Sequence, residues 1–132
     1  MNGKLIADNR RARHEYHLLE RLEAGLVLTG SEVKSLREGR ADLKRAYGDV
    51  RDGEAWLVGA HISGYDRAGY SNHDPDRDRK LLLRAKEIDS LYGKIKEKGL
   101  SLVPLKIYFK NGLAKVEIGV GRGKKLHDKR DA

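Results

Sequence analysis

The segment LVPLKIYFKNGLAKVEIGV, residues 102–120, constrains the fold more than any other part of the sequence. The dipeptide Asn111-Gly112 supplies the two positive-φ positions of a type I′ turn, and apolar and polar residues alternate on both sides of it. If Lys110 faces Leu113, one apolar side pairs Phe109 with Ala114, Ile107 with Val116, Leu105 with Ile118 and Val103 with Val120, and the other side pairs Tyr108 with Lys115 and Lys106 with Glu117. A slip of one residue would place isoleucine and valine opposite lysine. The sequence therefore predicts a two-residue β-hairpin.

A second hairpin is predicted around Asp52-Gly53, another dipeptide that favours a tight turn. The residues after the turn alternate in polarity. Those expected on one face are Trp56, Val58, Ala60 and Ile62. Further upstream, residues 25–29 have an extended pattern, whereas Tyr16, Leu19 and Leu22 fit either a helix or an irregular strand; we favour the strand.

Two helices are predicted between these strands. The first begins after Ser31, which serves as its N-cap, and ends at Gly39. The second covers residues 85–98 and ends at Gly99. The residues expected to face the core are Val33 and Leu36 in the first helix and Ala85, Ile88, Leu91, Tyr92 and Ile95 in the second.

Strands joined by hairpins, with helices at the corners, indicate a mainly β fold, either a small antiparallel barrel or a sandwich. A chain of 132 residues with 39% hydrophobic content is long enough for one compact domain and too short for two. Residues 63–78 are rich in glycine, serine, asparagine and aspartate and are predicted to form a loop.

Positive charge narrows the choice of partner. The chain has 28 Lys and Arg against 20 Asp and Glu, a net charge of +8, which favours a polyanion such as nucleic acid or an anionic membrane surface. The basic residues form four clusters: Lys4, Arg10, Arg11 and Arg13; Lys34, Arg37, Arg40, Lys44 and Arg45; Arg77, Arg79, Lys80 and Arg84; and the C-terminal tail. A barrel would bring such clusters onto one face, although four unconnected solvated patches remain the alternative.

The sequence offers little support for catalysis, a metal site or a membrane segment. HDPDRD, residues 73–78, has the opening spacing of a calcium loop, but Arg79 stands where glycine is required and Ala85 where glutamate is required. His14 and His17 lack the cysteines or acidic neighbours of a metal site and read as surface residues on a strand. There is no cysteine, and no apolar run approaches the roughly 18 residues of a membrane span.

Five blocks of sequence carry a resemblance to a known family. They are NRRARHEY at 9–16, EAGLVLTGSEVKSLR at 23–37, RKLLL at 79–83, KGLSLVPLKIYFKNG at 98–112 and GKKLHDKR at 123–130. Together and in this order they resemble the bacterial SsrA-binding protein family, also called small protein B or SmpB. The resemblance extends from residue 9 to residue 130 and is far more specific than any single motif.

The resemblance implies both a fold and a role. The fold would be an OB-like antiparallel β-barrel with helices that binds the tRNA-like domain of transfer-messenger RNA. Members of the family deliver this RNA, with elongation factor Tu, to ribosomes stalled without a usable stop codon, so that the peptide is tagged and the ribosome is freed. We therefore expect a cytoplasmic monomer that contacts ribosomal RNA and has no enzymatic activity, cofactor or metal.

The resemblance also implies candidate RNA-binding residues. By matching position and charge they are Asn9, Arg11, Arg13, Glu23, Lys34, Arg37, Lys80 and Leu82. Asn9 can donate and accept hydrogen bonds, and the carboxylate of Glu23 can accept from a base amine or a 2′-hydroxyl. Leu82 can pack on an unstacked base or a sugar. The alternatives are that Glu23 only precedes a turn and that Leu82 belongs to the core.

The basic end of the chain matches the family segment that lies toward the ribosomal decoding centre. Its candidate residues are Lys124, Lys125, His127, Asp128, Lys129 and Arg130. Family members continue into a longer basic tail, so the tail here is expected to be truncated, and its charge predicts disorder in the free protein. The predicted organisation is a flexible N-terminus at 1–8, an OB-like RNA-binding domain at 9–121 and the basic tail at 122–132.

Two other classes remain open from the residues themselves. A general RNA-binding barrel of the ribosomal type would share the charge but bind many structured RNAs alike. A small hydrolase or nuclease is the enzymatic alternative, and the sequence contains no catalytic constellation for it.

Overall fold

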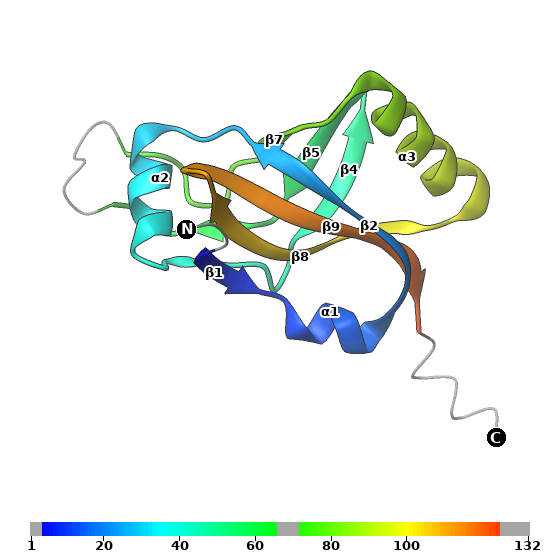
Figure 1. Cartoon of the computed structure of the whole chain (residues 1–132), viewed down its shortest axis with the longest axis horizontal. Coiled ribbons are helices and arrows are strands. Elements are labelled where there is room, and N and C mark those ends of the chain that lie inside the picture. The colour runs from blue at the N-terminus through cyan, green and yellow to red at the C-terminus, as the bar shows by residue number, and fades with distance from the viewer. Residues whose placement is uncertain (1–3, 66–71, 125–132) are drawn as a thin grey trace.

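The structure is a computed structural model that describes residues 4–65 and 72–124 (Figure 1). In chain order the elements are β1 (Lys4–Asp8), α1 (Arg10–Glu15), β2 (Tyr16–Leu26), α2 (Gly30–Arg37), β3 (Ala41–Asp42), β4 (Tyr47–Arg51), β5 (Glu54–Val58), β6 (His61–Ile62), β7 (Arg79–Leu82), α3 (Ala85–Lys98), β8 (Ser101–Lys110) and β9 (Leu113–Gly123). Within the described residues, none of these helices is long and apolar enough to cross a membrane.

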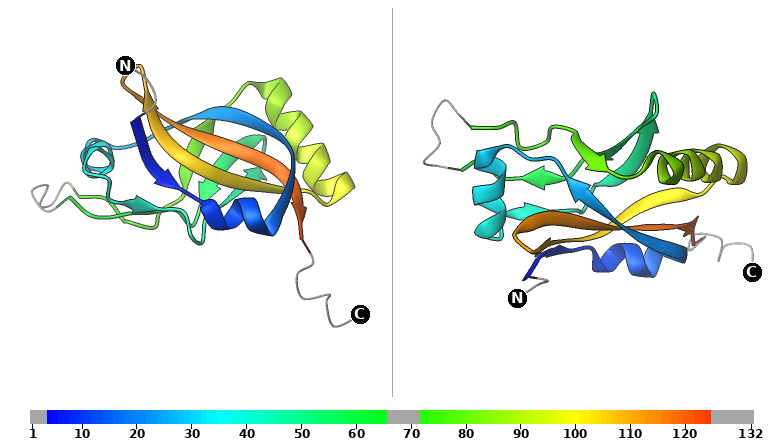
Figure 2. Two further views of the ribbon diagram at one scale, coloured as in Figure 1. Left: turned by 60° about the horizontal axis from the view of Figure 1, so that its bottom comes forward. Right: turned by 45° about the horizontal axis from the view of Figure 1, so that its top comes forward.

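The strands form a ring. In the main sheet the order is β1-β8-β4-β5-β7-β2-β9, every pairing is antiparallel, and β8 also pairs with β9, so that the strands from β8 round to β9 close on themselves. β1 pairs with the edge of β8 that does not pair with β9. β3 pairs with β6 as a small separate sheet. Figure 2 shows α2 and α3 at opposite ends of this ring. The predicted fold class, a small mainly β domain of antiparallel strands with short helices, is confirmed.

The hairpin of β8 and β9 turns at Asn111 and Gly112, both with positive φ, as predicted. The register is also as predicted from Lys110 opposite Leu113 to Lys106 opposite Glu117. Beyond that point the prediction is wrong, because a bulge at Leu105 shifts the pairing by one residue. The pairs beyond the bulge are Pro104 with Ile118, Val103 with Gly119, Leu102 with Val120 and Ser101 with Gly121.

The bulge allows β8 to bury both of its faces. Leu102 and Ile107 belong to the main core inside the ring, while Val103 and Leu105 pack with Ala12 of α1 in a second cluster on the outside. Because an inserted residue reverses the alternation of a strand, side chains on either side of Leu105 change faces. The helix α1 therefore covers part of the ring's outer surface.

The hairpin of β4 and β5 also has the predicted turn, with positive φ at both Asp52 and Gly53. The prediction that Trp56 and Val58 share one face with Ala60 and Ile62 is wrong, since Ala55 and Leu57 are the fully buried residues of β5. Ala60 and Ile62 are buried as expected. The alternation of buried and less buried side chains shifts by one residue at Gly59, because its φ of +77° interrupts the extended backbone between Leu57 and Ala60.

The two predicted helices are present, with differences in detail. α3 covers the predicted residues and ends in Gly99, which has left-handed backbone geometry. Its side chains Ile88 and Leu91 are buried, but Tyr92 is exposed rather than inward-facing. In α2 the N-cap is Thr29 rather than Ser31: its hydroxyl accepts from the Glu32 amide, and the Glu32 carboxylate accepts from the Thr29 amide in a capping box.

The N-terminal region differs most from the prediction. Residues 4–8, expected to be flexible, form β1 along β8. They are followed by the unpredicted helix α1, so that His14 lies on a helix and not on a strand. The favoured strand across residues 16–26 is confirmed, although it ends at Leu26 rather than at 29.

Candidate nucleic-acid interface

Glu23 and Leu82 lie together on the outer surface of the ring. Gly25, two residues along β2 from Glu23, pairs with Leu82 of β7. A Cβ atom on Gly25 would lie 3.2 Å from the Leu82 Cβ, so the glycine leaves Leu82 room to lie over β2. Both side chains line a shallow hollow of about 490 Å³. Leu82 is 55% exposed, which contradicts the alternative that it belongs to the core.

The Glu23 carboxylate is held by two groups from β8. The Tyr108 hydroxyl donates to Glu23 Oε2, and Lys110 Nζ lies 3.5 Å from the same oxygen. The hydrogen bond from Tyr108 lowers the pKa of Glu23 against a smaller opposing effect of burial, and the positive charge of Lys110 adds to the lowering. Glu23 is therefore a fixed anionic acceptor at neutral pH, and neither Tyr108 nor Lys110 was a candidate site residue from the sequence.

Lys34 and Arg37 project from α2, Lys34 beside Tyr65 and Arg37 beside Phe109 of β8. The Lys34 Nζ lies 5.6 Å from the centre of the Tyr65 ring, and the Arg37 guanidinium lies 5.5 Å from that of Phe109. Such cation–π contacts orient a positive charge without neutralising it. Among the described residues no carboxylate is ion-paired with either side chain, so both charges remain available to an anion.

The other predicted cations are partly neutralised by the protein itself. The ion pairs are Arg11 with Glu15 at 2.9 Å, Arg13 with Asp8 at 2.8 Å and Lys80 with Glu54 at 2.7 Å. The three cationic side chains are 34–75% exposed, so the pairs are the exchangeable kind found on surfaces. A phosphate could compete for each of them.

Asn9 has a structural role at the start of α1. It is the N-cap of α1: its Oδ1 accepts from the Ala12 amide at 3.3 Å, and its Nδ2 donates to the carbonyl of Pro104 at 3.0 Å. A second, longer bond joins Nδ2 to the Leu43 carbonyl at 3.4 Å. These contacts fasten α1 to β8, and the RNA-binding role of Asn9 stays a prediction.

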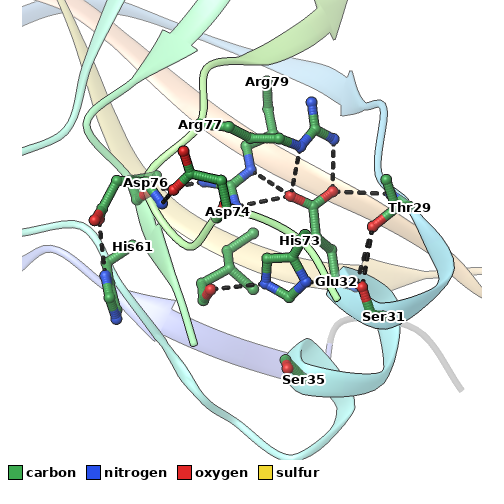
Figure 3. A network of polar contacts seen from close by, with 12 residues as sticks. Thr29, Ser31, Glu32, Ser35, His61, His73, Asp74, Asp76, Arg77 and Arg79 are labelled. Atoms are coloured by element: carbon green, nitrogen blue, oxygen red, sulfur yellow. Dashed lines mark hydrogen bonds and ion pairs between the residues drawn. The ribbon is translucent and has the colours of Figure 1, made fainter. Parts of the chain in front are cut away.

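Arg77 and Arg79 were grouped with the basic clusters that could meet phosphates, and the structure corrects this. Figure 3 shows both guanidinium groups turned inward onto the carboxylate of Glu32. Arg79 Nη2 lies 2.7 Å and Arg77 Nη2 lies 2.6 Å from its oxygens, and the side chains of Glu32 and Arg79 are both 0% exposed. The spacing of Thr29 and Glu32, typical of a capping box, is the sequence signal that could have placed this glutamate.

Burial alone would raise the pKa of Glu32, yet its hydrogen bonds outweigh that effect. The donors are Arg77, the Thr29 amide and Arg79, and they lower the pKa of Glu32 to about 2. Arg79 also donates to the carbonyl of Ala60 at 2.7 Å. This network ties α2 to β7 and to the loop before it, and it supports the surface on which Lys34 and Arg37 stand.

The aspartates with calcium-like spacing serve the loop instead. Asp74 Oδ1 accepts from the Asp76 amide at 3.0 Å, and Asp76 Oδ1 accepts from His61 Nδ1 at 2.8 Å (Figure 3). Within residues 4–65 and 72–124, no group of histidine, aspartate and glutamate is arranged to hold a metal ion.

The strand β9 extends to Gly123, past the predicted end of the domain at residue 121. The Lys124 amide then donates to the Glu15 carbonyl at 2.6 Å, which places the start of the tail beside the end of α1. The remaining tail candidates, Lys125, His127, Asp128, Lys129 and Arg130, lie outside the described residues.

The fold and its surface together define a small, basic, antiparallel β protein that carries a fixed carboxylate beside an exposed leucine. Comparison with known proteins then identifies the family. The model of the SmpB protein family matches residues 6–132. The chain belongs to the SmpB family.

Curated relatives and a solved structure agree with this assignment. Proteins named SsrA-binding protein are 59% identical in Oleidesulfovibrio alaskensis, covering 97% of this chain and 83% of the relative, and 60% identical in Gloeothece citriformis, covering 98% and 86%. A solved structure described as "tmRNA-SmpB: a journey to the center of the bacterial ribosome" contains a chain 52% identical to this one. It matches with a TM-score of 0.74 over 90% of this chain and 84% of that one.

Proposed function

We propose that this protein binds the tRNA-like domain of transfer-messenger RNA and helps to deliver that RNA to stalled ribosomes for peptide tagging and ribosome rescue. Membership of the SmpB family carries the proposal, and the SsrA-binding names of the relatives and the tmRNA-SmpB neighbour support it. The proposal places the protein in the cytoplasm with the ribosome, as a monomer, and assigns it binding without a catalytic step.

The outer surface supplies the groups that such binding needs. Lys34 and Arg37 can meet phosphates, and the ion-paired Arg11, Arg13 and Lys80 can exchange their carboxylates for phosphates. Glu23 can accept from a base amine or a 2′-hydroxyl, and only the latter distinguishes RNA from DNA. The exposed Leu82 beside it offers an apolar surface for a base or a sugar.

We further propose that two parts of the chain have different binding roles. The ring and its helices, within residues 9–121, bind the tRNA-like domain, because Glu23 and Leu82 lie there. The basic segment 122–132 serves contact with ribosomal RNA, by virtue of its five Lys and Arg and its match to the family segment at the decoding centre.

The proposed function predicts selective and salt-dependent RNA binding. We expect the labelled tRNA-like domain of transfer-messenger RNA to stay bound in the presence of excess bulk tRNA. Its affinity should fall by about 0.7–0.9 log units per phosphate contact for each log unit of salt. Filter binding over a salt series measures both. Equal competition by bulk tRNA would instead favour a general RNA-binding protein, and a flat salt response would contradict phosphate contacts.

Glu23→Gln tests the acceptor directly. The variant keeps the side-chain size but loses the charge, so we expect RNA binding to weaken by about 1–3 kcal/mol, the range for a hydrogen bond to a charged group. The matched control is Glu20→Gln on the same strand, since Glu20 is ion-paired only with Lys94 of α3 among the described residues, at 2.6 Å. Tighter binding by Glu23→Gln would show that the carboxylate merely repels phosphate.

A further inference from the structure

We propose that Tyr108 is a positioning residue for RNA recognition, which fixes the carboxylate of Glu23 so that its second oxygen faces the ligand. This inference rests on the proposed function and adds a residue to its site. Tyr108 lies on β8 and Glu23 on β2, with β9 between them, so the tyrosine side chain reaches across a whole strand to donate to Glu23 Oε2.

Glu23 needs such an anchor because of what faces it on β9. Its direct cross-strand partner is Glu117, another carboxylate, and like charges in that position repel one another. Glu117 is itself a hydrogen-bond acceptor and offers Glu23 no donor, and its Oε1 is buried without a hydrogen-bond partner in the described structure. A glutamate also has several rotatable bonds whose freedom must be lost before it can present an oxygen in one place.

The two donors both act on the same oxygen of Glu23. Tyr108 donates to Oε2, and Lys110 Nζ lies 3.5 Å from Oε2, too long for more than a weak contact. Among the described residues no donor is directed to Oε1, so this oxygen remains open to a ligand. With its side chain 36% exposed, Glu23 is accessible from the hollow that it shares with Leu82.

Tyr108 is well suited to remain the donor. Burial and the neighbouring Glu23 carboxylate both raise the pKa of Tyr108, so the phenol keeps its proton throughout the pH range of RNA binding. A hydrogen bond from a hydroxyl to a carboxylate is charge-assisted and stronger than one between neutral groups. Glu23 is thus set in place before RNA arrives, and less ordering is required on binding.

The test is a double-mutant cycle with Tyr108→Phe and Glu23→Gln in the full chain. Tyr108→Phe removes only the hydroxyl, and we expect affinity for the tRNA-like domain to fall about fivefold, the scale of one net hydrogen bond. Adding Tyr108→Phe to Glu23→Gln should cause no further loss, because Tyr108 acts only through Glu23. Tyr92→Phe is the control, since Tyr92 is an exposed tyrosine on α3 whose ring lies beside Lys96 rather than Glu23.

The possible outcomes are distinguishable. Additive losses in the cycle would mean that Tyr108 acts independently of Glu23, and unchanged or tighter binding by Tyr108→Phe would mean that it does not hold Glu23 for the ligand; either result overturns this inference alone. Urea unfolding of each variant shows whether a loss of binding follows from a loss of structure. A loss of that kind would occur whether position 23 is glutamate or glutamine. If the unaltered protein does not prefer the tRNA-like domain, the proposed function fails and this inference fails with it.

Discussion

Glu32→Gln is expected to lower the free energy of unfolding by about 3–5 kcal/mol, the cost of breaking a buried ion pair from one side. The variant preserves the shape of the side chain and leaves the guanidinium of Arg79 buried, with a side chain 0% exposed, without its countercharge. It also weakens the contact to Arg77 at 2.6 Å. Urea denaturation followed by circular dichroism measures the change.

Glu54→Gln is the matched control for that experiment. It also removes one glutamate from an ion pair, at 2.7 Å from Lys80, but both side chains are more than 40% exposed. Exposed pairs contribute about 0–1 kcal/mol, so the control should unfold near the unaltered protein. If Glu32→Gln loses no more stability than the control, the network in Figure 3 does not hold α2 to β7.

The buried ion pair of Glu32 with Arg79 makes the stability of the protein sensitive to acid. The hydrogen bonds to Glu32 lower its folded-state pKa from 4.5 to about 2. The stabilisation is therefore fully present above about pH 4.5 and is lost as the pH falls toward 2, because the unfolded chain binds the proton first. Glu32→Gln should lack this part of the pH dependence, so the two proteins should converge in stability as the pH approaches 2.

The elements that could be predicted from the sequence are those specified by neighbouring residues. Asn111-Gly112 determines its turn whatever surrounds it, and the helix at 85–98 has its apolar spacing and its terminating Gly99 within the segment itself. Local signals of this kind need no knowledge of the partner elements. The bulge at Leu105 was not predictable in the same way, because it depends on α1 covering the far face of β8.

The candidate site shows the same limit. The resemblance placed Glu23 and Leu82 at the site, and the ring brings them together through Gly25. Charge alone misassigned Arg77 and Arg79, because their carboxylate partner, Glu32, is more than forty residues away in the sequence. The hydroxyl of Tyr108 meets Glu23 across 85 residues of sequence, and the pairing of β9 with both β8 and β2 makes them neighbours.

Gly59 explains the wrongly predicted face of β5, and it provides a prediction with a large effect. Its φ is +77°, and a Cβ atom there would lie 2.5 Å from the carbonyl oxygen of Arg45. Gly59→Ala therefore adds two costs, about 1–2 kcal/mol for a left-handed residue with a side chain and about 1–3 kcal/mol for the collision with the backbone. We expect a total loss of about 2–5 kcal/mol in the free energy of unfolding, measured by urea denaturation.

Gly53→Ala separates these two costs. Gly53 has nearly the same φ, +76°, but a Cβ atom there meets no atom within 4 Å. This variant should pay only the conformational cost of about 1–2 kcal/mol. The difference between the two variants then measures how closely the chain at Gly59 approaches Arg45. Equal losses would mean that the segment relaxes away from Arg45 at little cost, and the change of phase between Leu57 and Ala60 would then follow from backbone conformation alone.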